Sequence, residues 1–387
     1  MGQVARNIHS MNSAGGNPFD LNLARAYSAP EAFCPRRDLD ELLARSMAGQ
    51  LWTLIVGDRR MGKSSAVIAA AVRAGWPILH VDLMGIRSEE EIAERFRWAW
   101  RLFLQQEARG FFGGVKPQLS AKIPGTAVEV KLGADRREAA TLPVSWGDVL
   151  AAFDRRVAKK RAMLFIDEFQ DLGALPDEGV KMTRSLRAAL QMARHITPVL
   201  AGSSNRLLAP LFATSAAAFF KAIRLQYQLD PFGRERFGEW ADKIFRTQKR
   251  SLEAAALSRL FEFTEGVTED LVASCAEIWV QQSNQRPITP ADIEFGWRSV
   301  VANATALILP RVSALPAAQA RLLRYIARNP KAQPFADQTL RELGEKSGSV
   351  HKALKRLLEM ELVRQEERDG RKRVWVHDPR LAFYLRT

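Results

Sequence analysis

Residues 57–64 have the types and spacing that bind phosphate groups. They read Gly-Asp-Arg-Arg-Met-Gly-Lys-Ser and match the pattern G-x-x-x-x-G-K-[ST]. Glycines let the backbone curl so that successive N–H groups face the phosphates, and the following helix N-terminus adds partial positive charge. Lys63 is predicted to reach the β- and γ-phosphates of ATP, and Ser64 to ligate Mg²⁺. The predicted nucleotide contacts are Gly57, Asp58, Arg59, Arg60, Met61, Gly62, Lys63, Ser64 and Ser65.

Two adjacent carboxylates, Asp167 and Glu168, follow an apolar run of four residues. A buried strand would deliver both to the carboxyl edge of a sheet, where ligands of such sheets bind. Asp167 is predicted to hold the hydrated Mg²⁺. Glu168 is predicted to polarise a water for attack on the γ-phosphate. A solvated acidic loop is the alternative, and the nearby phosphate loop argues against it.

A third polar cluster, Ser203-Ser204-Asn205, follows another apolar run. In ATPases built this way, a polar side chain at this place senses the γ-phosphate and orients the water. Ser203, Ser204 and Asn205 are therefore catalytic candidates beside Lys63 and Glu168. Each of them could equally cap the helix expected from Arg206.

The elements that must position these residues form an α/β pattern. An apolar run at 51–56 and runs of similar form at 78–83, 162–167 and 197–202 predict buried parallel strands. Stretches with helical patterning at 63–74, 88–109 and 181–194 alternate with these strands. This order favours a parallel sheet covered by helices on both faces. The phosphate loop thus stands between a strand and a helix, as its pattern requires. Residues 111–142, interrupted by Gly and Pro, are predicted to be a β-hairpin insertion.

The remaining ranges complete a division into four parts. Residues 1–30 lack sustained periodicity and predict an N-terminal arm that is mobile or wraps over a neighbouring surface. The ATPase core then covers 31–230. A helical lid is expected over 231–309, and a winged helix over 310–387, where three helical segments precede two short strands.

The C-terminal part is the basic one. The chain has 387 residues with 57 Lys and Arg against 43 Asp and Glu, a net charge of +14. Residues 311–387 contain 17 basic and 9 acidic residues and so carry +8 of that charge. Such an excess suits an anionic partner. On the second helix of the winged helix and on its wing, the predicted contacts with double-stranded DNA are His351, Lys352, Lys355, Arg356, Arg371 and Arg373. Protein docking or autoinhibition by this module is the alternative, since acidic residues lie close by.

Cysteine usage and hydropathy predict a cytoplasmic protein. Cys34 and Cys275 form no CxxC pattern and no His/Cys cluster, which argues against a disulfide framework or a zinc site. No apolar stretch approaches the roughly 18 residues of a membrane span, and residues 1–20 lack a signal-peptide core.

The motifs together resemble the STAND-related "archaeal ATPase" branch of the AAA+ P-loop ATPases. This resemblance implies an AAA+ core with a parallel sheet, then a helical lid and a C-terminal winged helix. It extends over about residues 17–387. Besides the phosphate loop, the similar segments are 17–19, 33–42, 164–172, 201–204, 219–222, 229–232, 377–380 and 384–385.

Two positions depart from the family pattern. Lys221 stands where the family usually has an arginine, and its ammonium lacks the planar fork that binds a phosphoryl group bidentately. Slow hydrolysis is therefore expected, and which residue acts as arginine finger stays open, with Arg206 and Arg224 as nearby substitutes. The lid segment 264–268 also lacks the proline that the family often has.

Three functions fit these observations. The first is an ATPase whose Mg-ATP switch is coupled to DNA, as a homo-oligomer or with a partner protein. The second is a STAND-type signalling ATPase whose winged helix docks protein. The third, an interaction protein with degenerate nucleotide chemistry, is disfavoured by the intact Lys63, Ser64, Asp167 and Glu168.

Overall fold

The computed structural model forms two compact units. One consists of residues 21–230, and the other joins residues 16–20 to 231–387. The ranges that the structure describes are 16–110, 119–122, 129–132, 143–158, 160–175, 177–203, 208, 211–212, 219, 221–281, 286–330, 333–368 and 371–387.

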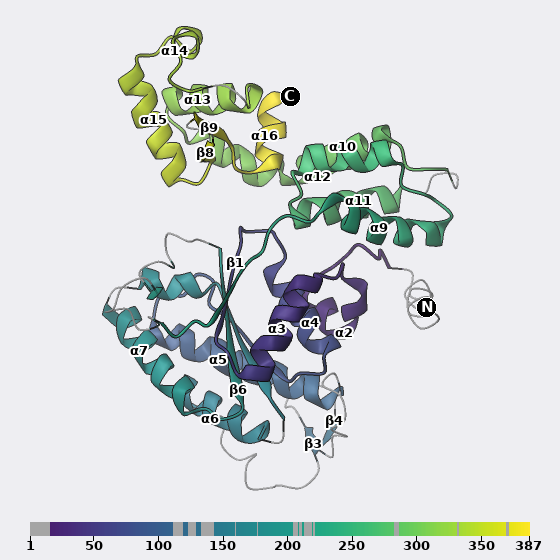
Figure 1. The fold of residues 1–387 in the computed structure, drawn as a ribbon, viewed down its shortest axis with the longest axis vertical. Coiled ribbons are helices and arrows are strands. Elements are labelled where there is room, and N and C mark those ends of the chain that lie inside the picture. The colour runs from purple at the N-terminus through teal and green to yellow at the C-terminus, as the bar shows by residue number, and fades with distance from the viewer. Residues whose placement is uncertain are drawn as a thin grey trace. The chain divides into compact units, whose positions relative to one another are not determined.

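The first unit is built on a five-stranded parallel sheet (Figure 1). Its strands are β1 (Thr53–Val56), β2 (Ile78–Asp82), β5 (Ala162–Asp167), β6 (Ile196–Gly202) and β7 (Leu225–Gln228). Their order is β2-β5-β6-β1-β7, so β6 separates β1 from β5. The four strands expected from the sequence are present, and β7 adds an edge strand whose residues alternate between half-buried and exposed. Such a strand lacks the mostly apolar run that marks the other four strands.

Helices lie on both faces of this sheet, with α3 and α4 on one side and α6 and α7 on the other (Figure 1). This confirms the predicted α/β class. The helices of the unit are α2 (Leu23–Ser28), α3 (Arg37–Gly49), α4 (Lys63–Arg73), α5 (Glu89–Ala108), α6 (Trp146–Arg156) and α7 (Asp177–Met192), with 3₁₀ turns η1 (Pro30–Ala32) and η2 (Phe169–Ala174). Ser145 begins α6, and its hydroxyl accepts a 3.1 Å hydrogen bond from the Asp148 N–H in a capping box.

Two further strands lie inside the range expected to be a hairpin insertion. β3 (Leu119–Lys122) pairs antiparallel with β4 (Glu129–Leu132), and Leu119 lies opposite Leu132. The rest of 111–142 lies outside the described residues.

The second unit begins with a helical part. Its elements are α9 (Arg234–Phe245), η3 (Arg246–Gln248), α10 (Ala254–Thr264), α11 (Thr268–Val280) and α12 (Pro290–Ser313). Phe19 inserts between these helices, with its ring centroid 4.9 Å from Phe245, 5.5 Å from Trp240 and 6.0 Å from Trp279. Residues 16–20 therefore pack on the helical part of this unit.

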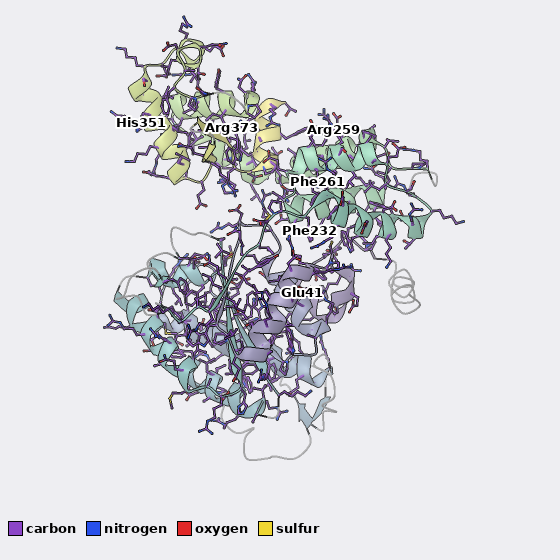
Figure 2. All side chains as sticks on the ribbon, viewed as in Figure 1. Glu41, Phe232, Arg259, Phe261, His351 and Arg373 are labelled. Carbon is purple, nitrogen blue, oxygen red and sulfur yellow. The ribbon has the colours of Figure 1, made fainter. Side chains whose placement is uncertain are left out.

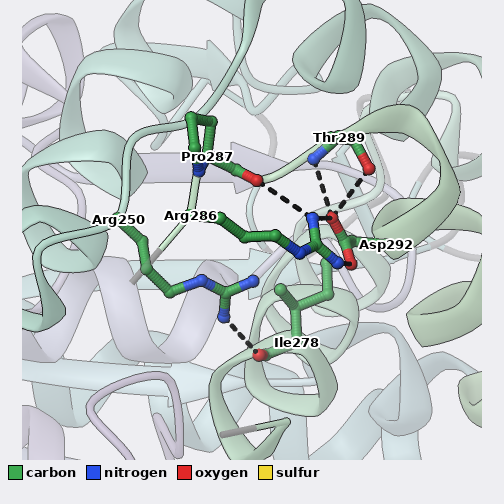
Figure 3. Close-up of polar contacts among 6 residues, drawn as sticks. All are labelled: Arg250, Ile278, Arg286, Pro287, Thr289 and Asp292. Carbon is green, nitrogen blue, oxygen red and sulfur yellow. Dashed lines mark hydrogen bonds and ion pairs between the residues drawn. The ribbon is translucent and has the colours of Figure 1, made fainter. Parts of the chain in front are cut away.

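The start of α12 is fixed by a polar cluster (Figure 3). Arg286 binds both carboxylate oxygens of Asp292, Nη2 to Oδ1 at 2.6 Å and Nη1 to Oδ2 at 2.7 Å. Asp292 also accepts hydrogen bonds from the backbone and hydroxyl of Thr289. Burial alone would raise the pKa of Asp292, but the hydrogen bonds from Arg286 and Thr289 lower it to about 2. Asp292 is therefore ionised at neutral pH and caps the helix.

A winged-helix arrangement completes the second unit. Its elements are α13 (Ala317–Arg328), α14 (Asp337–Leu343), α15 (Ser347–Glu359), β8 (Val363–Arg368), β9 (Arg371–Val376) and α16 (Pro379–Arg386), with β8 antiparallel to β9. α12 continues through Pro310, and its Ile308 and Val312 pack into the same core as Leu323 and Leu357. The boundary expected at 309/310 thus falls inside a helix.

The winged helix packs against the helical part within this unit. Arg380 on α16 donates from Nε to Asp270 Oδ1 at 2.6 Å and from Nη2 to Glu269 Oε1 at 2.7 Å, both on α11. The Phe383 ring lies 5.4 Å from Phe263 and 6.1 Å from Trp297. Asp270 is fully buried, so its carboxylate needs the ion pair with Arg380 to stay ionised.

Candidate phosphate site and basic surface

The loop after β1 has the backbone conformation that its glycines predict. Gly62 has φ +76° and directly precedes α4, whose first residue is Lys63. A Cβ on Gly57 would lie 2.9 Å from the carbonyl oxygen of Leu229, so the residue after β7 leaves no room for a side chain there. Arg60 also adopts a left-handed conformation, with φ +68°. The loop therefore curls between the end of β1 and the N-terminus of α4.

Lys63 is buried within this loop. Its ammonium donates to the carbonyl oxygens of Gly57 at 2.8 Å and Asp58 at 3.1 Å, and 5% of the residue is exposed. Burial lowers the pKa of Lys63, while the carboxylates of Glu168 and Asp167 raise it. The ammonium thus sits at the mouth of the loop, near two carboxylates.

The predicted metal ligands converge from two elements. Ser64 Oγ on α4 donates a hydrogen bond to Asp167 Oδ2 at the end of β5. Burial raises the pKa of Asp167 to about 6, while its hydrogen bond with Ser64 acts in the opposite direction. His80 Nε2 lies 3.9 Å from the same carboxylate oxygen, but burial lowers the pKa of His80 to about 4, so the imidazole is neutral at pH 7.

These two oxygens fit a magnesium ion that is bound with a nucleotide. Hydroxyl and carboxylate oxygens are hard ligands, and Mg²⁺ usually takes one or two of them together with phosphate oxygens and water. Within the described ranges, no three His, Cys, Asp or Glu gather as an all-protein metal site. A cation at Ser64 and Asp167 would therefore depend on phosphate and water for its other ligands.

Glu168 lies at the same edge of the sheet and takes part in a hydrogen-bonded cluster. Its Oε2 accepts from Ser203 Oγ at 3.1 Å and from the amide of Gln170. Glu168 has φ +49°, a left-handed conformation that turns the chain sharply after β5. Because β6 is the neighbour of β5, Ser203 at the end of β6 lies beside Glu168. Ser204 and Asn205 lie outside the described residues.

Two residues near this edge have roles that sequence patterns do not show. Gln170 joins Glu168 to Ser203. Arg36 is 8% exposed and donates to the carbonyl oxygens of Met61 at 3.3 Å and Asp230 at 2.8 Å, so it braces the phosphate loop against the end of the segment after β7. Both lie in segments that the family resemblance covers, but no spacing rule singles them out.

Lys221 lies near the amino ends of the strands, away from the carboxyl ends where the phosphate loop begins. It lines a pocket of about 370 Å³ whose wall includes Trp52, the residue before β1, and Ile196, the first residue of β6. Arg224, one of its two proposed substitutes, lines the same pocket, and Arg206 lies outside the described residues. Lys221 and Arg224 thus lie at the amino ends of the strands, whereas the phosphate loop follows a carboxyl end.

The basic residues of α15 form one exposed face. His351, Lys352, Lys355 and Arg356 are exposed, while the opposite face of α15 packs into the core through Val350, Ala353, Leu354 and Leu357. Arg356 Nη1 lies 3.0 Å from Glu359 Oε2.

The wing contributes one further described cation. Arg373 on β9 is exposed, and Val374 and Val376 beside it are buried (Figure 2 labels Arg373 and His351). Arg371 is the first residue of β9. The winged helix thus presents an exposed basic face on α15 and an exposed arginine on β9.

Comparison with known proteins decides the fold. A Walker-type ATPase of Pyrococcus abyssi matches with a TM-score of 0.65 and 18% identity, over 92% of this chain and 97% of that chain. The chain has the fold of a Walker-type ATPase. This confirms the AAA+-like architecture that the resemblance predicts.

Weaker structural matches exist to two other proteins. The ORC1 protein of Aeropyrum pernix in complex with DNA matches with a TM-score of 0.45 and 12% identity, over 90% of this chain and 89% of that one. The RuvB Holliday junction branch migration motor of Thermotoga maritima matches at 0.44 and 13%, over 89% and 93%. No family model and no curated protein matches the sequence.

None of the helices in the described part of the chain is both long and apolar enough to cross a bilayer.

Proposed function

We propose that the chain binds and hydrolyses Mg-ATP and couples this cycle to double-stranded DNA through its winged helix. The observation that supports this best is the convergence of Lys63, Ser64, Asp167 and Glu168 at the carboxyl edge of one parallel sheet, directly beside a phosphate loop. The Walker-type fold supports the nucleotide part. A cytoplasmic location remains the expectation from the sequence.

Each residue then has a distinct role. The N–H groups of residues 57–65 and the N-terminus of α4 bind the phosphates, and Lys63 exchanges its two backbone acceptors for β- and γ-phosphate oxygens. Ser64 and Asp167 hold Mg²⁺, which neutralises charge on the phosphates when bound. Glu168 accepts a proton from the water that attacks the γ-phosphorus, while the bond from that phosphorus to the bridging oxygen breaks and ADP leaves.

The DNA part of the proposal depends on charge and on packing. The exposed face of His351, Lys352, Lys355 and Arg356 would enter a groove, and Arg371 and Arg373 would contact the backbone nearby. Since Arg380 and Phe383 bind the winged helix to the helical part of the same unit, a movement of that part would carry the DNA surface with it.

A signalling ATPase with a protein-docking winged helix is the second candidate. It is favoured by the ion pair between Arg356 and Glu359, because that pair places a carboxylate on the basic face. In this case nucleotide exchange rather than turnover would be the relevant event.

For the ATPase candidate, a partner or a second copy would supply the arginine that Lys221 replaces. Lys221 and Arg224 line a pocket at the amino ends of the strands, so they cannot serve the phosphate loop of their own chain. Without a partner, we expect turnover well below about 1 s⁻¹. Rapid hydrolysis by the isolated protein would contradict this expectation.

Glu168→Gln should retain ATP binding and lower kcat at least about tenfold, because the amide keeps the shape but is a far poorer base. Steady-state phosphate release and calorimetric ATP affinity would be measured together. Glu94→Gln, on the exposed face of α5, is the matched control. Turnover by Glu168→Gln at the wild-type rate would remove Glu168 from the mechanism.

A further inference from the structure

Gln170 is a buried side chain whose whole amide is hydrogen-bonded. It is 1% exposed and lies in η2, two residues after Glu168. Its Nε2 donates to Glu168 Oε2, to Asp171 Oδ1 at 3.2 Å and to Ser203 Oγ at 3.3 Å. Its Oε1 accepts from the backbone N–H of Ser203 at 3.2 Å. One amide therefore connects the loop after β5 with the end of β6.

The end of β6 is shaped to admit this amide. A Cβ on Gly202 would lie 2.7 Å from Gln170 Oε1, closer than real Cβ contacts. A Cβ at position 202 would therefore force the Gln170 amide and the Leu208 side chain, 2.8 Å away, to shift. The connection thus depends on a glycine in the neighbouring strand as well as on Gln170 itself.

The two oxygens of the Glu168 carboxylate have different surroundings. Oε2 accepts from both Gln170 and Ser203. In the part of the chain that the structure describes, no residue donates to Oε1. The carboxylate is therefore held through Oε2 by donors from two different segments.

We infer that Gln170 is a positioning residue. It orients the Glu168 carboxylate toward the water that attacks the γ-phosphorus, and it connects that orientation to Ser203. This inference rests on the proposed role of Glu168 in ATP hydrolysis. The proposed effect of Gln170 acts through Glu168, to which its amide donates. A misplacement of about 1 Å in a catalytic group costs on the order of 10²-fold in rate, so a fixed carboxylate has a large effect on turnover.

Gln170→Met tests this role, because methionine keeps the length and volume of the side chain and removes both the donor and the acceptor. We expect kcat to fall roughly 10- to 100-fold, while the Kd for ATP, measured by calorimetry with a non-hydrolysable analogue, stays within about twofold. Gln105→Met, on the exposed face of α5, is the matched control and should match wild type. Wild-type kcat in Gln170→Met would show that only packing matters and would overturn the inference.

A double-mutant cycle with Glu168→Gln separates positioning from general damage to the fold. If Gln170 acts only through Glu168, Gln170→Met should lower kcat little further in the Glu168→Gln background. Independent, multiplying effects would contradict the inference and leave the role of Glu168 intact. If Glu168→Gln alone turns over at the wild-type rate, the proposed function fails instead, so the two failures are distinguishable.

Discussion

Lys63→Ala is expected to abolish measurable ATP binding, with a loss of affinity of at least about a hundredfold. A hydrogen bond to a charged group contributes roughly 1.5–3 kcal/mol, and Lys63 would make such contacts with two phosphates in a site where water is largely excluded. Its ammonium is 5% exposed and already lies over the loop, 2.8 Å from the Gly57 carbonyl oxygen. Removing it leaves the phosphate charge without its counter-ion.

Calorimetry with Mg-ATP would measure this loss, and circular dichroism would establish that the variant is folded. Lys181→Ala is a suitable control because Lys181 is an exposed lysine on α7 in the same unit. Unchanged affinity in a folded Lys63→Ala protein would show that the phosphate loop is not the nucleotide site.

The second large effect is expected on the affinity for duplex DNA. Reversal of Lys352, Lys355 and Arg356 to Glu should weaken duplex binding on the order of a hundredfold at about 0.1 M salt, without changing ATP affinity. Each phosphate contact releases condensed counter-ions and contributes about 0.9 to the slope of log K against log salt, so the slope should flatten by roughly 2–3. All three side chains are exposed on one face of α15, so their reversal leaves the core untouched.

A matched charge control is available on the other unit. Reversal of Arg45, Lys181 and Arg184, which are exposed on α3 and α7, changes the net charge by the same amount. It should leave the DNA affinity nearly unchanged. Reversal of Arg371 and Arg373 on the wing should give a smaller loss than the α15 variant. If the α15 reversal leaves affinity and salt slope intact in a folded protein, the signalling function with a protein-docking winged helix becomes the better proposal.

Local patterns account for the parts of the fold that the sequence predicts. Apart from β7, the strands of the parallel sheet are mostly apolar runs. The glycines at 57 and 62 have the close approach and the positive φ that their motif requires. β7 was not expected because an edge strand with one exposed face lacks such a run. Pro310 suggests a boundary, but α12 continues past it since Ile308 and Val312 pack into the winged-helix core.

Some residues of the candidate site can be predicted from local sequence motifs, and others cannot. Lys63, Ser64, Asp167 and Glu168 follow from motifs whose spacing reflects one strand end and one helix start. Gln170 and Arg36 act through partners brought close only by tertiary folding, Ser203 at the end of another strand and Asp230 beyond β7. Sequence spacing carries no signal for such contacts.

DNA affinity measured with and without Mg-ATP tests the proposed coupling most directly. Fluorescence anisotropy with a labelled duplex at two salt concentrations would be compared for the wild-type protein and Lys63→Ala. The coupling free energy between two binding sites is typically about 1–3 kcal/mol. Mg-ATP should therefore change the DNA affinity of the wild-type protein at least about fivefold. It should leave the DNA affinity of Lys63→Ala unchanged. Equal wild-type affinity in the presence and absence of Mg-ATP, at both salt concentrations, would contradict the coupling.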